Sequence, residues 1–315
     1  MSENSIERSR LTQNIKLITK GLINNFNSFK INKKMKNIVL TKYDRIFLWK
    51  FVAELTMTDN VNLQYKAAFK IAKEKPNEYQ NKFASYRRLM DRKWLKLAKT
   101  EAFVGEGGLI ENATLIEEII IIERPNITYC PELHVTSILL CQHLEPQNSY
   151  LILTRLFNKS LINESHITYL NGIYVLIEII KKYCRNKLAK KIILFKDNSE
   201  TFFLNWKFWV FNLPQNILLY LMDRLILKGI KCLYKACIVI LILYFKTNSK
   251  SVQNVVDDDI VEFVNVYNWE LNKFIKVYNS INSFSRRDIL KISLVFFKKA
   301  KTKDYEILLD KGLSE

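Results

Sequence analysis

Residues 202–244 read FFLNWKFWVFNLPQNILLYLMDRLILKGIKCLYKACIVILILY, and this stretch decides the fold. After Pro214, leucines and a methionine recur every three or four residues up to Leu225, which is the spacing of one face of an α-helix. Beyond Gly229, an uncharged apolar run extends over Ala236–Phe245. That run is too short to cross a bilayer and is typical of a buried helix. The stretch therefore predicts two helices, one on either side of Gly229.

The overall composition favours a helical protein. The chain has 315 residues, of which 49% are hydrophobic, enough for one large core or two smaller lobes. Only 7 Gly and 5 Pro are present, fewer than turn-rich β architectures need, so helices joined by short loops are expected. The first residues, Met1 to Lys20, are polar and charged and do not resemble a secretory signal. The five cysteines lack CxxC spacing, which indicates free thiols in a reducing, cytoplasmic compartment.

Helical periodicity also dominates the rest of the chain. An apolar stripe runs over residues 167–180, and shorter helices are expected over 109–123, 133–143 and 150–157. Residues 247–258 are polar and then acidic, which predicts a solvated loop. After this loop we expect two more helices, at about 259–279 and 285–300.

The same pattern predicts the organisation of the chain. No internal repeat and no long low-complexity linker are evident. We therefore expect a basic N-terminal extension over residues 1–40, a main helical domain over 41–246, and C-terminal helices over 247–315 that pack on this domain.

The charge of the chain indicates an anionic partner. The net charge is +18 at pH 7, and most of it lies in residues 1–100. A basic surface of this size suits nucleic acid, an anionic membrane or an acidic protein, although a composition rich in Asn, Lys and Ile also raises the lysine content everywhere. Trp206 and Trp209 are interpreted as core residues rather than as a base-stacking platform, and no RNA-binding motif accompanies them. Nucleic acid is therefore not expected as a partner.

Two stretches resemble a TBC domain, the fold of Rab GTPase-activating proteins. In residues 202–244 the family has a Trp-containing helix, a Leu-Pro turn, an Asp-ended helix and a glycine. The matching positions are Trp206, Pro214, Asp223 and Gly229. Residues 103–157 are similar to one subgroup, the Skywalker type, and so is Ser283–Ile289 after the domain. Arg45 and Trp49 match the opening Arg-x-x-x-Trp of the family.

The resemblance implies an all-α fold made of two helical lobes that form a V. Skywalker carries a separate TLDc domain after its TBC domain, and residues 301–315 leave no room for one. The resemblance thus predicts a TBC domain of the Skywalker type without the C-terminal TLDc domain.

The resemblance also implies Rab-type small GTPases as partners in membrane and vesicle trafficking. Activators of this family supply an arginine from Ile-x-x-Asp-x-x-Arg and a glutamine from Tyr-x-Gln-Gly. In this chain the segment around Phe103 contains no arginine, and Cys130 and Pro131 follow Tyr129 where the glutamine is expected. We therefore expect association with Rab proteins without conventional dual-finger catalysis. The alternative is an active Rab GTPase-activating protein that uses unconventional arginines, namely Arg87, Arg88 or Arg92.

Proteins of the Skywalker type bind phosphoinositide headgroups through cationic side chains, so the resemblance implies peripheral association with phosphoinositide-containing vesicle or plasma membranes. Carried over residue by residue, this cationic site falls on Lys16, Lys20, Lys231, Lys235 and Arg286, with Arg287 as a neighbour.

The residues support this site independently of the family. Lys16 and Lys20 form an i,i+4 pair of like charges, and so do Lys231 and Lys235. Each pair destabilises a helix by about 0.2–0.5 kcal/mol. Ser285 and Asp288 have the spacing of a capping box, which places the two arginines in the first turn of a helix. Cations there oppose the helix dipole, and a bound phosphate would reverse the sign of this effect. We expect exchange of Lys231 and Lys235 for Glu to abolish membrane binding and to leave thermal stability unharmed.

No metal and no cofactor are expected. The cysteines and histidines Cys130, His134, Cys141 and His143 lie close together in the sequence, but their spacing fits no usual zinc pattern. They are interpreted as buried structural residues.

Overall fold

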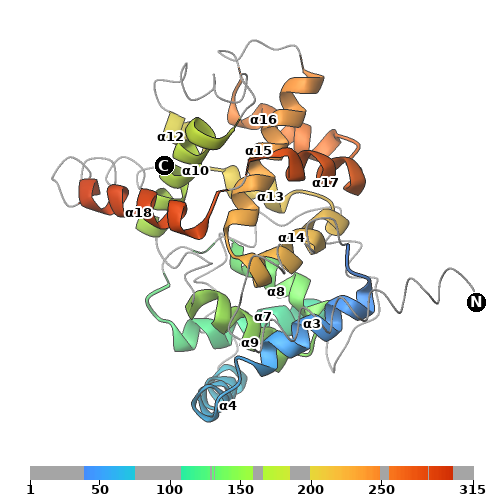
Figure 1. The fold of residues 1–315 in the computed structure, drawn as a ribbon. Helices are drawn as coiled ribbons and strands as arrows, with labels where there is room; N and C mark the ends of the chain where they lie inside the picture. The colour runs from blue at the N-terminus through green and yellow to red at the C-terminus, as the bar shows by residue number, and fades with distance from the viewer. Residues whose placement is uncertain are drawn as a thin grey trace, which may run out of the picture. The chain divides into compact units, whose positions relative to one another are not determined.

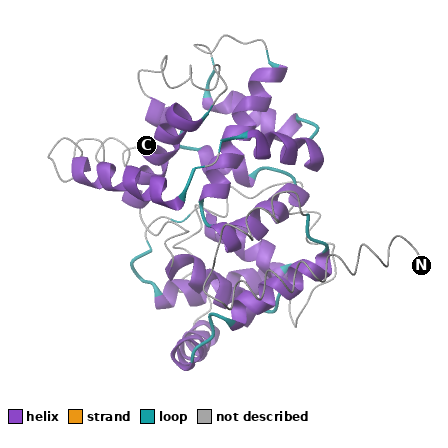
Figure 2. Ribbon diagram, viewed as in Figure 1, coloured by secondary structure: helices purple, strands orange, loops and turns teal. Residues whose placement is uncertain are grey.

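The structure is a computed structural model that describes residues 39–74, 108–127, 130, 132–158, 166–184, 199–248, 255–282 and 284–300. Every regular element within these ranges is a helix, and none of the described residues lies in a β-strand (Figure 2). The predicted all-α fold is thus confirmed. The chain divides into two compact units.

The first unit consists of residues Met1–Ile127, Pro131–Ile162 and Met222–Leu227, so far as they are described. Its helices are α3 (Lys42–Glu54), α4 (Asp59–Glu74), α7 (Leu109–Glu123), α8 (Glu132–Cys141) and α9 (Pro146–Asn158) (Figure 1). Helix α7 contacts α4, α8 and α9, and α9 also contacts α3. Every residue of α8 is buried, as expected for a helix in the interior of its unit.

The second unit consists of Thr128–Cys130, Asn163–Leu221 and Lys228–Glu315, again so far as they are described. Its helices are α10 (His166–Tyr183), α12 (Ser199–Phe202), α13 (Trp206–Phe211), α15 (Lys231–Thr247), α16 (Asp257–Val266), α17 (Leu271–Ser280) and α18 (Arg286–Ala300). Helix α14 (Gln215–Lys228) begins in this unit, and its residues Met222–Leu227 belong to the first unit.

Helix α15 is the central element of the second unit. It is buried from Cys232 to Phe245 and packs against α10, α13, α16 and α17, while α18 lies against α10 (Figure 1). Gly229 has a φ of 78°, a left-handed conformation that suits glycine because it has no Cβ, and it separates α14 from α15. Both the buried apolar helix and the helix boundary at Gly229 are confirmed.

The predicted helix over 259–279 is wrong, because two helices cover this range. Helix α16 ends at Val266 and α17 begins at Leu271. The indole N–H of Trp269 donates a hydrogen bond to the carbonyl of Val264 at 2.9 Å and so satisfies one acceptor at the end of α16. The ring of Trp269 also packs on Tyr267, with centroids 4.9 Å apart. Neither glycine nor proline marks this break, so the sequence gives no signal of it.

The other helices predicted from the sequence are present in the structure. Helix α7 covers the predicted 109–123, and α8, α9 and α18 differ from the predicted ranges by a few residues at their ends. Pro146 is the first residue of α9, and Pro214 directly precedes α14, as proline requires. The predicted limits of the N-terminal extension, the main domain and the C-terminal helices stay predictions.

Candidate functional site

Four of the six predicted headgroup-binding residues lie among the described residues, and all four belong to the second unit. These are Lys231 and Lys235 on α15 and Arg286 and Arg287 on α18. The remaining two, Lys16 and Lys20, lie outside the described residues, as do Arg87, Arg88 and Arg92.

Lys235 holds the end of a neighbouring helix. Its side chain is 9% exposed, and its ammonium group donates hydrogen bonds to the carbonyl oxygens of Ile281 at 3.1 Å and Tyr278 at 3.5 Å. The ammonium also lies 5.2 Å from the centroid of the Tyr278 ring. These carbonyls belong to the C-terminal end of α17, where backbone acceptors lack partners and the helix dipole is negative. Lys235 therefore stabilises the C-terminal end of α17, and these hydrogen bonds fix the position of its ammonium group.

This contact changes the expectation drawn from the sequence. Replacement of Lys235 by Glu would place a carboxylate beside two carbonyl oxygens, and we now expect a loss of stability. The i,i+4 repulsion with Lys231 is small by comparison. Lys231 is the first residue of α15, and burial lowers the pKa of its ammonium group.

The capping box at the start of α18 is confirmed. The backbone N–H and hydroxyl of Ser285 donate to Asp288 Oδ2 at 2.7 and 2.8 Å, and the Asp288 N–H donates to the Ser285 hydroxyl at 3.1 Å. The bonds from Ser285 lower the pKa of the Asp288 carboxyl. Arg286 and Arg287 are both exposed in the first turn of this helix.

A short stretch of chain joins the residue that Lys235 contacts to the two arginines. Lys235 binds the carbonyl of Ile281, and the chain from Ile281 to Arg286 spans at most about 18 Å even when fully extended. The sequence did not identify Lys182, whose positive charge contributes to the lowered pKa of Asp288. Lysines in the last turn of a helix are commonly explained by the helix dipole, so Lys182 gave no separate signal. The arrangement of cations is suited to binding an anion.

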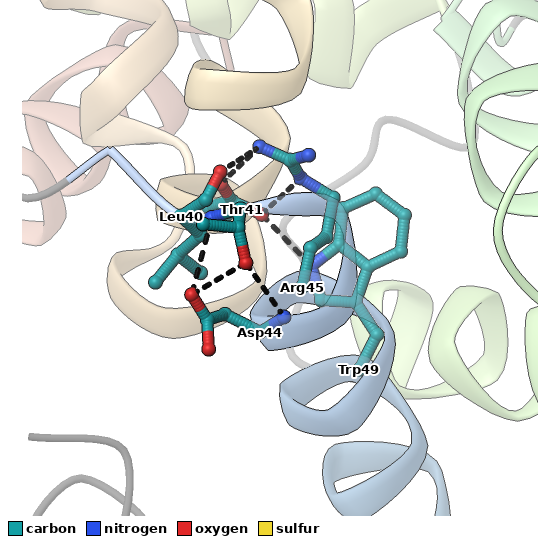
Figure 3. Close-up of polar contacts among 6 residues, drawn as sticks. Leu40, Thr41, Asp44, Arg45 and Trp49 are labelled. Carbon is teal, nitrogen blue, oxygen red and sulfur yellow. Dashed lines mark hydrogen bonds and ion pairs between the residues drawn. The ribbon is translucent and has the colours of Figure 1, made fainter. Parts of the chain in front are cut away.

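The Arg-x-x-x-Trp motif of Arg45 and Trp49 has a structural role in the first unit (Figure 3). Arg45 Nε and Nη2 donate to the two carboxylate oxygens of Asp223 at 2.9 and 3.0 Å, and Trp49 Nε1 donates to Oδ1 at 3.1 Å. Arg45 Nη2 also donates to the carbonyl of Leu40 at 3.3 Å. The side chains of the ion pair are 6% and 1% exposed, and burial raises the pKa of Asp223 to about 6 although Arg45 opposes the rise. These buried groups join α3 to Met222–Leu227 and are not available to a ligand.

A capping box starts α3 at the same place. The hydroxyl of Thr41 donates to Asp44 Oδ2 at 2.7 Å and accepts from the Asp44 N–H at 3.2 Å (Figure 3). This box fixes the first turn of α3, which carries Arg45.

His134 and His143 contact protein side chains. His134 Nδ1 lies 2.5 Å from Oε1 of the buried Glu117. The ring of His143 packs edge-on against Trp49 with centroids 5.5 Å apart, and burial lowers its pKa to about 4. Cys130 and Cys141 are buried. Across the described ranges, no group of three or more His, Cys, Asp or Glu is arranged to hold a metal ion.

None of the helices that the structure describes combines the length and the hydropathy that a membrane-spanning segment requires.

Comparisons with known proteins agree with the fold and with the sequence motifs. Residues 115–249 match the family model of the Rab-GTPase-TBC domain. The chain is 28% identical over 143 residues to the GTPase-activating protein skywalker of Drosophila melanogaster, a match that covers 42% of this chain and 24% of that protein. The chain thus spans about a quarter of the length of this curated relative.

Two solved structures of the TBC domain of Skywalker/TBC1D24 from Drosophila melanogaster share the fold. The first has a TM-score of 0.64 at 18% identity and covers 91% of this chain and 95% of that chain. The second, a complex with inositol(1,4,5)triphosphate, has a TM-score of 0.65 at 17% identity and covers 87% and 98%. Residues 115–249 are thus identified with the Rab-GTPase-TBC domain, and the chain shares the fold of the Skywalker TBC domain.

Proposed function

We propose that this TBC-domain protein binds phosphoinositide headgroups at a cationic site and associates with Rab-type small GTPases at vesicle or plasma membranes. The site would be formed by Lys231, Lys235, Arg286 and Arg287, together with Lys16 and Lys20. The observation that supports this proposal is the exposure of Arg286 and Arg287 in the first turn of α18, five residues after the Ile281 carbonyl that Lys235 binds.

The charges of this region suit a phosphate ligand. Arg286 and Arg287 are exposed and can form two parallel hydrogen bonds to a phosphate, a geometry that lysine cannot provide. Lys182 adds a further positive charge near the same helix start. Lys235 would share its ammonium group between the headgroup and the two carbonyls of α17, so we expect its contribution to be indirect. The relative solved with inositol(1,4,5)triphosphate indicates the class of ligand.

A vesicle flotation experiment tests the site. The double variant Arg286→Glu and Arg287→Glu should bind vesicles containing phosphatidylinositol bisphosphate about thirtyfold more weakly than the wild type, since each cation near an anionic surface contributes roughly 1 kcal/mol. Both side chains are exposed, so the thermal midpoint should change little. Wild-type binding should also weaken as the salt concentration rises.

The matched control reverses two exposed charges in the other unit. Lys66 and Lys73 lie exposed on α4, and their exchange for Glu changes the net charge by the same amount. If both double variants lose the same affinity, the attraction depends on net charge alone and the proposed site is wrong.

We further propose that Rab association occurs without dual-finger catalysis. Pro131 follows Cys130 at the position where the family has its glutamine. Proline has no side-chain amide that could orient a water molecule. Cys130 itself is buried, with 1% of its surface exposed. The match of residues 115–249 to the Rab-GTPase-TBC family indicates the class of partner.

GTP hydrolysis by a panel of Rab proteins tests this second proposal. We expect the chain to stimulate hydrolysis by much less than about a thousandfold, because an arginine finger alone contributes about 10³–10⁵. A larger stimulation with any Rab would show an active enzyme. Loss of that stimulation in Arg88→Ala would then identify an unconventional arginine.

A further inference from the structure

Helix α18 presents an exposed apolar ridge along one side, next to the face that packs on α10. Its inner face packs through Phe296, whose ring lies 5.6 Å from that of Tyr174, and through Ser293, which accepts a hydrogen bond from Asn171 at 3.3 Å. Beside this inner face, three large apolar side chains are exposed to solvent. These are Leu290 at 53%, Leu294 at 61% and Phe297 at 36% exposed.

The three ridge residues follow one another at i, i+4 and i+7, so they form a single line along the helix. Val295, 46% exposed, is a further apolar side chain outside this line. Single exposed leucines are common on protein surfaces, but a continuous apolar line along one helix marks a surface for interaction.

A row of cations accompanies the ridge. Arg287, Lys291 and Lys298 are exposed and lie at i, i+4 and i+11, which places them in a row beside the ridge. Arg286 and Lys299 add further positive charge at the two ends of the helix. The single acid of α18 is Asp288, and its carboxylate is bound to Ser285 in the capping box. The exposed side of α18 is therefore apolar and basic.

We propose that α18 is an interfacial membrane helix that inserts the ridge of Leu290, Leu294 and Phe297 into an anionic lipid surface. This inference rests on the proposed phosphoinositide binding, and it adds an apolar contribution along the helix that starts with Arg286 and Arg287. Helices that lie in the plane of a membrane combine such an apolar line with flanking lysines and arginines, which reach the phosphates while the apolar side chains enter the acyl boundary. With 15 residues and several charges, α18 lies on a bilayer and does not cross it.

The charge of the helix argues against a second copy of the chain as the occupant. Two α18 helices packed ridge to ridge would bring their rows of cations close together, and like charges at an interface are unfavourable. An anionic lipid surface can bury the apolar side chains of the ridge and bind the row of cations at the same time.

The test uses the full chain with the double variant Leu290→Gln and Leu294→Gln. Both positions are exposed and glutamine is a good helix former, so we expect the fold and thermal midpoint to be kept. On vesicles of phosphatidylcholine with phosphatidylserine or with phosphatidylinositol bisphosphate, we expect at least about tenfold weaker binding, since each buried leucine contributes appreciably to transfer from water. The matched control is Leu63→Gln on α4, where the leucine is 66% exposed, and it should bind like the wild type.

Insertion is measured directly with a fluorescent label. All five native cysteines are buried, so Leu294→Cys introduces an exposed thiol for an environment-sensitive dye. We expect a blue shift on anionic vesicles and quenching by spin labels in the acyl chains, with neither at Leu63→Cys. Equal vesicle binding by the wild type and the glutamine double variant would overturn the ridge while leaving the headgroup site intact. A dimer that the double variant converts to a monomer, with unchanged vesicle binding, would assign the ridge to a second copy instead.

Discussion

Replacement of Arg45 by Met should destabilise the protein by about 3–5 kcal/mol, which is a large share of the stability of a typical domain. The change leaves the carboxylate of Asp223 buried at 1% exposure without the guanidinium that holds both of its oxygens. The indole N–H of Trp49 would still donate a hydrogen bond to this carboxylate. Chemical denaturation at neutral pH measures the loss.

The loss should depend on pH in a defined direction. Burial already raises the pKa of Asp223 to about 6, and removal of Arg45 takes away the group that opposes this rise. A carboxyl whose pKa is higher in the folded state than the ordinary value of about 4 binds protons more tightly when folded. The stability that Asp223 contributes to the variant is therefore present at pH 4 and is lost as the pH rises through 6 and above. We expect the variant to be less impaired at pH 5 than at pH 8.

Two further variants distinguish the effect of breaking the ion pair from the effect of losing one positive charge. Lys42 is exposed at the start of the same helix, and Lys42→Met should have little effect. The double variant Arg45→Met and Asp223→Leu should recover most of the lost stability, because neither charge is then buried alone. The remaining deficit would reflect the unpaired indole N–H of Trp49. If Arg45→Met costs no more than Lys42→Met, the pair does not hold α3 to Met222–Leu227.

Replacement of Lys235 by Glu should destabilise the second unit by at least about 3 kcal/mol. The substitution removes the hydrogen bonds from the Lys235 ammonium group to the carbonyls of Ile281 and Tyr278. Each such bond contributes about 1.5–3 kcal/mol when the donor is charged. The new carboxylate, at a position that is 9% exposed, would also face the negative end of α17. Amide hydrogen exchange should locate the effect, with the largest loss of protection in the last turn of α17.

The controls for Lys235 lie on the same helix. Lys246 is exposed in the last turn of α15, and Lys246→Glu should cost at most about 1 kcal/mol through the helix dipole. Lys235→Met keeps the apolar stem and should fall between the two. Equal stability of Lys235→Glu and Lys246→Glu would show that the contact with α17 does not stabilise the protein. Because Lys235 acts on stability, a headgroup-binding defect is better sought at Arg286 and Arg287.

The sequence by itself determined the all-α fold, several of its helices and the resemblance to TBC domains. Apolar spacing predicted α7, α10 and α15, because burial of one face or of the whole helix leaves a periodic record in the residues. Ser285 and Asp288 predicted the start of α18, because a capping box is a local interaction between residues three apart. The break between α16 and α17 left no such record, since it depends on how the ring of Trp269 packs.

Only the tertiary structure decided what the charged residues do. Arg45 and Asp223 stand 178 positions apart, and each matched a family motif, but the motifs did not show that the two residues form one buried ion pair. Lys235 and Ile281 stand 46 positions apart, and spacing alone identified this lysine only as one of an i,i+4 pair of like charges. The exposed ridge on α18 became visible only when the inner face was seen to pack on α10. Periodicity shows that a helix has two faces, but which face a neighbour covers, and which charge finds a partner, is set by contacts between segments far apart in the chain.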